Sequence, residues 1–79
     1  MLPDTVEKIK NSLKKFDINV DDGDEDFILK NNIDSITFIH TILGIEEEFS
    51  ILVPDEYLLM DNLNTIHKIA NMVEELSQI

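Results

Sequence analysis

The segment that decides the fold runs from Asp34 to Phe49 and reads DSITFIHTILGIEEEF. Its apolar side chains recur with the period of a helix and cover about half of the helical wheel. These residues are Ile36, Phe38, Ile39, Ile42, Leu43, Ile45 and Phe49. Such a wide apolar face predicts a central helix that contacts several neighbours and leaves one apolar residue exposed. Either Asp34 or Ser35 is expected to cap this helix, because both side chains can accept a hydrogen bond from a free backbone N–H.

Two further amphipathic helices flank this segment. The first is expected to end at Asp17, and the last to begin at a cap formed by Asn64 or Thr65. Their apolar stripes are Val6, Ile9, Leu13 and Phe16 in the first helix and Ile66, Ile69, Val73 and Leu76 in the last. We therefore predict an all-α four-helix bundle with three main helices, one short third helix over 55–60 and a long first loop over 17–34.

Length and composition limit the classes of protein to consider. Seventy-nine residues suffice for one small domain, and we treat 1–79 as a single domain. The absence of cysteine excludes disulfides, thiolate metal sites and cysteine nucleophiles, and it suits a reducing compartment. The N-terminus lacks the pattern of a signal peptide, and no apolar run is long enough to span a bilayer. We expect a soluble, cytoplasmic monomer that does not bind membranes.

The charge balance points to protein partners. Seventeen acidic residues and six basic residues give a formal net charge of −11. Binding to nucleic acid or to an anionic membrane needs Lys and Arg, so neither is expected as a partner. A field of this sign instead attracts proteins with basic docking patches. Disorder is the weaker interpretation of this acidity, because 43% of the residues are apolar and they fall in helical registers.

The acidic stretch 17–28 superficially resembles an EF-hand calcium loop. That loop needs Gly at position 6, for a sharp turn, and a bidentate Glu at position 12. Counted from Asp17, these positions hold Asp22 and Ile28, and Gly23 comes one residue late. We therefore predict no metal ligand and a solvated loop held by its own apolar residues, with a calcium-responsive module as a third hypothesis. The apolar residues are Ile18, Val20, Phe27 and Ile28.

Ser35 has no catalytic surroundings in the sequence. A serine nucleophile needs a histidine and an acid in one cluster, and His40, five residues later, points to a different side of the helix. Gly23 and Gly44 stand alone, so the chain has no glycine-rich phosphate loop. We predict that the protein is not an enzyme and has no catalytic residue.

Three stretches follow one another in a characteristic order: NIDSI at 32–36, EEEFSILVPDE at 46–56 and NTI at 64–66. Together they resemble the acyl carrier protein family, which includes the peptidyl carriers of nonribosomal synthesis. The first stretch matches the attachment motif Gly-x-Asp-Ser-[Leu/Ile] except at its first position. The second matches an acidic run that ends in Phe and is followed by an aliphatic residue and Pro-Asp-Glu. The resemblance covers nearly the whole chain, including the order of the helices.

The resemblance implies that Ser35 carries a covalent 4'-phosphopantetheine arm attached by a phosphopantetheinyl transferase, which Asp34 helps to recognise. The arm would hold acyl or aminoacyl groups as thioesters for loading and condensing enzymes with basic docking patches. The N-terminal end of a helix dipole favours the phosphate of such an arm. The positions that the family uses for partner contact correspond to Ile36, His40, Leu43, Glu46 and Glu47. Core packing is the alternative role for Leu43, and solvation is the alternative for the glutamates.

Two departures from the family pattern narrow the expectation. Asn32 replaces the usual glycine, but asparagine tolerates a positive φ better than most residues. His40 and the pair at 37–38 differ from the residues that fatty-acid carriers usually have. We therefore expect a free-standing carrier in nonribosomal peptide, polyketide or related biosynthesis, whose cargo the sequence does not name. A housekeeping fatty-acid carrier is the first alternative, and an acidic helical adaptor without a prosthetic group is the alternative of another class.

Overall fold

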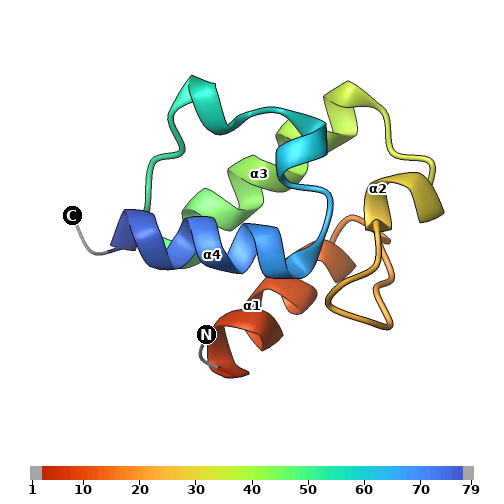
Figure 1. The fold of residues 1–79 in the computed structure, drawn as a ribbon, viewed down its shortest axis with the longest axis horizontal. Helices are drawn as coiled ribbons and strands as arrows, with labels where there is room; N and C mark the ends of the chain where they lie inside the picture. Colours follow the sequence, from red (N-terminus) through yellow and green to blue (C-terminus); the bar gives the residue numbers. More distant parts are fainter. Residues whose placement is uncertain (1–2, 78–79) are drawn as a thin grey trace.

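The computed structural model describes residues 3–77, in which every regular element is helical and no strand occurs. The three main helices are α1 (Pro3–Lys14), α3 (Ser35–Phe49) and α4 (Ile66–Ser77). α1 packs against both α3 and α4, and Figure 1 shows the three helices. The prediction of an all-α chain with three main helices is therefore confirmed.

The core lies where these three helices meet, and it is built from the predicted stripes. α1 contributes Ile9 and Leu13, and α4 contributes Ile66, Ile69 and Val73, all buried. The loop residues expected to hold the first loop also behave as predicted, since Ile18, Phe27 and Ile28 are buried and Val20 packs against the core. Phe16 is the exception, because it lies at the edge of the core and its ring is partly exposed beside Gly44.

Three helices end in the same way, with a residue in the left-handed region followed by isoleucine. The left-handed residues are Asp17 (φ 61°), Asn32 (φ 52°) and Ser50 (φ 54°). In each case the N–H of the following isoleucine donates to a carbonyl five residues back, at 3.1, 3.0 and 3.1 Å respectively. This is the hydrogen bond of a Schellman motif, and the isoleucine supplies the apolar contact that accompanies it. The last residue of α1 is Lys14, and the predicted end at Asp17 is the left-handed residue of the turn that follows.

The first loop contains a short helix that the sequence did not predict. This helix, α2 (Phe27–Lys30), begins at Asp26, whose side chain accepts a hydrogen bond from the Leu29 N–H at 2.9 Å. Four residues are too few for the 3.6-residue apolar period to be recognised, and Phe27 and Ile28 appeared only as apolar residues within a loop. The expectation of an irregular connection over 17–34 is therefore wrong for this part.

The first loop is fastened to the start of α4. The His67 N–H donates to the Gly23 carbonyl at 3.1 Å, and the His67 ring contacts the Asp24 carboxylate through Nδ1. The Phe27 N–H donates to the Asn64 carbonyl at 3.0 Å, and the Asn64 amide donates to Asp26 at 2.9 Å. A long, acidic segment is thus held in one place by its contacts with residues 37 to 44 positions away.

The connection from α3 to α4 differs from the predicted short helix over 55–60. It contains two 3₁₀ turns, η1 (Asp55–Tyr57) and η2 (Met60–Asn62), separated by Leu58 and Leu59, of which only Leu59 is extended. Isolated short apolar runs do not distinguish an α-helix from 3₁₀ turns, and tight i→i+3 bonds let the chain turn twice in little space. Thr65 caps α4 by accepting from the Lys68 N–H at 3.1 Å, which decides between the two predicted caps.

Candidate functional site

The start of α3 distinguishes the roles of Asp34 and Ser35. Asp34 occupies the cap position, and its carboxylate accepts a hydrogen bond from the Thr37 N–H at 2.8 Å. Ser35 is the first residue of the helix proper, and its side chain is exposed. Since Asp34 does the capping, the Ser35 hydroxyl is not needed to hold the helix end and is available for other chemistry.

The electrostatic setting of this helix end favours an anion. The hydrogen bond from the Thr37 backbone lowers the pKa of Asp34 below the ordinary aspartate value, so this carboxylate stays ionised near neutral pH. The first backbone N–H groups of a helix have no partner within it. The Asp34 carboxylate accepts a hydrogen bond from the Thr37 N–H, and the N–H groups of Ser35 and Ile36 lie at the positive end of the helix dipole.

The turn before Ser35 has the geometry that its sequence predicts. Asn32 has φ 52°, in the left-handed region where glycine is the usual residue and asparagine is the best-tolerated substitute. The Asn32 N–H donates to the Leu29 carbonyl at 3.2 Å, and the Ile33 N–H to the Ile28 carbonyl at 3.0 Å. The prediction that asparagine preserves this turn is confirmed.

An open groove of about 650 Å³ begins at Ser35 and runs along the first half of α3. The opposite wall is formed by the second connection, from residue 58 to residue 62. The groove is lined by Ser35, Phe38, Ile39, Leu58, Leu59, Met60, Asp61 and Asn62. This wall could not be predicted from the sequence, because it comes from a segment more than 20 residues after Ser35.

An exposed apolar strip runs along α3 next to Ser35. Ile36 is 68% exposed, Ile39 is 39% exposed and Leu43 is 50% exposed. The expectation of one exposed apolar residue on this helix is therefore wrong, and so is the core alternative for Leu43. The three residues share a helix face because they are spaced at i, i+3 and i+7. Ile39 was not predicted to belong to this exposed face. The sequence did contain a signal for it, because the apolar arc of the helix is too wide for one core to cover.

The polar residues predicted to contact partners lie on or beside the same strip. His40 and Glu47 are exposed. Glu46 is partly buried and has a structural role, because its carboxylate accepts a hydrogen bond from the Val53 N–H at 2.8 Å. This bond ties the second connection to the end of α3 and explains why an acid lies within the apolar arc of the helix.

Two further findings concern alternatives to this site. Among the described residues, no group of three or more His, Cys, Asp or Glu side chains comes close enough to hold a metal ion. Within the same range, no helix is long and apolar enough to cross a bilayer.

Comparisons of the chain with protein-family models, with curated proteins and with solved structures each found no match.

Proposed function

We propose that this protein is a carrier that holds acyl or aminoacyl intermediates as thioesters on a 4'-phosphopantetheine arm attached to Ser35. The proposal rests on the different roles of Asp34 and Ser35 at the start of α3. Asp34 caps the helix, so the exposed Ser35 hydroxyl is free to form a covalent bond without loss of the helix end. The order of sequence motifs that resembles carrier proteins supports the same conclusion.

The residues around Ser35 suit a phosphodiester at its oxygen. In the attachment step the Ser35 Oγ bonds to the phosphorus of the pantetheine phosphate in coenzyme A, and the pyrophosphate bond to the nucleotide breaks. The serine proton passes to a base of the transferase, and 3',5'-adenosine bisphosphate leaves. The N–H groups of Ser35 and Ile36 and the helix dipole would stabilise the new phosphate. When bound, the arm supplies a thiol that forms the thioester.

Partner recognition is proposed to use the exposed strip beside Ser35. Ile36, Ile39 and Leu43 offer apolar contact, and His40 and Glu47 border them with polar groups. The net charge of −11 would speed encounters with enzymes that carry basic patches. The partners we propose are a phosphopantetheinyl transferase and the loading and condensing enzymes of nonribosomal peptide, polyketide or related biosynthesis, in the cytoplasm.

The test is attachment of the arm to the full chain. Incubation with coenzyme A and a promiscuous phosphopantetheinyl transferase is expected to add one arm, measured by intact mass. Ser35→Ala should abolish the addition, whereas Ser77→Ala, at an exposed serine near the end of α4, should leave it unchanged. Circular dichroism of Ser35→Ala should match the wild type, because Asp34 still caps α3. A wild-type chain that stays unmodified would contradict the proposal.

The exposed strip also suits an adaptor that binds a basic partner without any prosthetic group. This second candidate predicts that partner binding is indifferent to Ser35→Ala and to coenzyme A. A pull-down that compares the wild type, its modified form and Ser35→Ala therefore separates the two functions. Binding that depends on the arm supports the carrier.

A further inference from the structure

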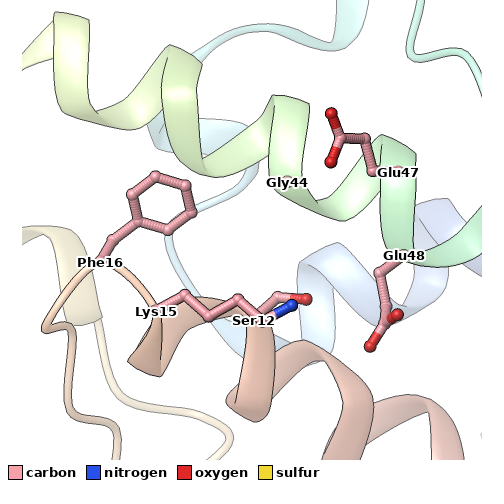
Figure 2. Close-up of a pocket in the computed structure, with 6 residues that line it drawn as sticks. All are labelled: Ser12, Lys15, Phe16, Gly44, Glu47 and Glu48. Atoms are coloured by element: carbon pink, nitrogen blue, oxygen red, sulfur yellow. The ribbon is translucent and has the colours of Figure 1, made fainter.

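The two glycines of this chain have different neighbours, and one of them follows an aspartate. Gly44 lies within α3, after a leucine and beside the Phe16 ring (Figure 2). Gly23 lies in the first loop directly after Asp22, and this is the one Asp–Gly pair in the chain. Glycine has no Cβ, so its amide nitrogen is the least hindered that can follow an aspartate. Among the aspartates, Asp22 therefore has the carboxyl carbon most open to attack by the next main-chain nitrogen.

The structure leaves both reacting groups of this pair accessible. Asp22 is exposed, and its carboxylate accepts one hydrogen bond among the described residues, from the Asp24 N–H at 2.9 Å. The ring of atoms that this bond closes includes the Gly23 nitrogen, so the carboxyl group is folded back along the main chain. The Gly23 N–H itself donates to no acceptor within residues 3–77. The fold therefore does not hold the nitrogen that has to react.

Gly23 is also the point at which the first loop is fastened to α4. Its carbonyl accepts a hydrogen bond from the His67 N–H at 3.1 Å, and a Cβ at this position would lie 2.8 Å from the His67 Nε2. The Asp22 carbonyl accepts a hydrogen bond from the Glu25 N–H at 3.2 Å, which closes the turn around Gly23. A change in the main chain between residues 22 and 23 therefore acts directly on this fastening.

We propose that Asp22 is a modification site, at which the chain rearranges to isoaspartate and loosens the first loop from α4. The Gly23 nitrogen bonds to the Cγ of the protonated Asp22 carboxyl group, and the carboxyl hydroxyl leaves as water with the proton of that nitrogen. The product is a five-membered succinimide. A water molecule then attacks the α-carbonyl carbon of residue 22, whose bond to nitrogen breaks. The chain now continues through Cγ, and its composition is unchanged.

The rearranged chain cannot keep the native turn. The main chain is longer by one methylene group, and the former Asp22 carbonyl becomes a free carboxylate that branches from Cα. The Glu25 N–H loses its main-chain acceptor, and the tightly packed Gly23 is displaced from His67. The rest of the loop stays in place, because Phe27 is buried in the core. The expected product is a folded chain with a loosened first loop.

Ageing of the full chain in mildly acidic buffer tests the assignment of the site. Peptide mapping with electron-transfer fragmentation should find a species lighter by one water and then isoaspartate at residue 22, before any forms at Asp24 or Asp61, which are also exposed. Asp22→Glu keeps the charge but would need a six-membered ring, so both products should be lost. A folded wild type without isoaspartate at residue 22, or with another aspartate modified first, overturns the proposal.

Amide hydrogen exchange of the purified isoaspartyl chain tests the loosening. The N–H groups of His67 and Glu25 should lose protection, because their acceptors belong to residues 23 and 22. The Ile51 N–H, which donates to the Glu46 carbonyl at 3.1 Å at the end of α3, should keep its protection. Unchanged protection of His67, or loss of protection at Ile51 as well, would overturn a local loosening. Neither measurement involves Ser35, so the result is independent of the proposed carrier function.

Discussion

The two long connections of this chain leave their helices through the same kind of turn and are then held in place by different forces. The first, over 15–26, is fastened by side-chain hydrogen bonds and ion pairs: Lys30 contacts Asp21 at 2.9 Å and Glu25 at 3.2 Å. The second, over 50–65, makes two 3₁₀ turns and buries Val53 and Leu63. The composition of each connection explains how it is held, because burial of acidic side chains is costly and they form hydrogen bonds and ion pairs at the surface instead.

The first connection also has apolar contacts, since it buries Ile18 and has an apolar anchor where it enters α2. Phe27 is buried in the core, and two residues later Leu29 is 79% exposed. Both belong to the same four-residue helix. Substituting Phe27 and Leu29 in turn therefore separates the stability contributed by the buried anchor from that contributed by the short helix itself.

The largest effect is expected from removing this anchor. Phe27→Ala should lower the free energy of unfolding by about 3–5 kcal/mol, because it leaves a cavity the size of a phenyl ring. Leu29→Ala, the matched control, should change it by less than about 0.5 kcal/mol. Urea denaturation followed by circular dichroism measures both. Similar costs for the two variants would mean that α2, and not the buried ring, stabilises the first connection.

A smaller effect is expected where the first connection meets α4. A Cβ at Gly23 would lie 2.8 Å from the His67 Nε2, so Gly23→Ala should push the ring away from Asp24 and cost about 1–2 kcal/mol. Gly44→Ala is the control: its Cβ would lie 3.1 Å from the partly exposed Phe16 ring, which can shift. Removing a mid-helix glycine should then stabilise by about 0.5–1 kcal/mol. Thermal melting should show a lower melting temperature for Gly23→Ala and a higher one for Gly44→Ala. A change in the same direction for both variants would contradict this account.

The exits from the helices should respond alike in the two connections. Asp17 and Ser50 both have a positive φ, at which glycine avoids the steric cost of a Cβ. Asp17→Gly and Ser50→Gly are each expected to stabilise by about 0.5 kcal/mol, the gain being reduced by the greater freedom of glycine in the unfolded chain. Denaturation of the two variants side by side measures this. A gain at one exit alone would show that the turns are not equivalent.

The smallest effects should appear as a pH dependence that differs between the connections. The Lys30 hydrogen bond lowers the pKa of Asp21, so this contribution is complete above the ordinary aspartate pKa of 3.8 and is lost as pH falls through the folded value. The Glu75 carboxylate, which accepts from Tyr57 Oη at 3.2 Å, raises the pKa of Tyr57. That contribution is complete below 10.0 and is lost as pH rises through the folded value.

Amide hydrogen exchange can measure this difference. Below pH 3.8 the first connection should lose protection before the second. Salt at 1 M, where the Debye length is about 3 Å, should have the same effect because it screens the ion pairs of Lys30. Lys30→Gln should remove this acid response, whereas Tyr57→Phe should leave it unchanged. High pH distinguishes the two connections less well, because both lose a contribution there. Asp21 and Glu25 raise the pKa of Lys30, so the first connection also loses stability as Lys30 is deprotonated. Simultaneous loss of protection in both connections would contradict the contrast between them.

Local sequence patterns were sufficient to predict the three main helices and the turn that follows the first one. Their stripes recur every three or four residues, so the signal is repeated within each segment and needs no distant partner. Local patterns also predicted the turn before Ser35, since Asn32 is tolerated at a positive φ for local steric reasons. The short helical elements were not predicted, because segments of four or fewer residues are too short for the 3.6-residue apolar period to be recognised.

Two features could be known only from the folded chain: which of two adjacent side chains caps α3, and which apolar residues stay exposed. Asp34 and Ser35 are both good caps, and only the backbone geometry, with Asp34 in the extended region, leaves Ser35 free. Ile36, Ile39 and Leu43 are as apolar as their buried neighbours, but the packing of residues 3–77 leaves all three exposed. Burial depends on what lies opposite a side chain, and the groove beside Ser35 has a wall from residues 58–62 that local patterns cannot place.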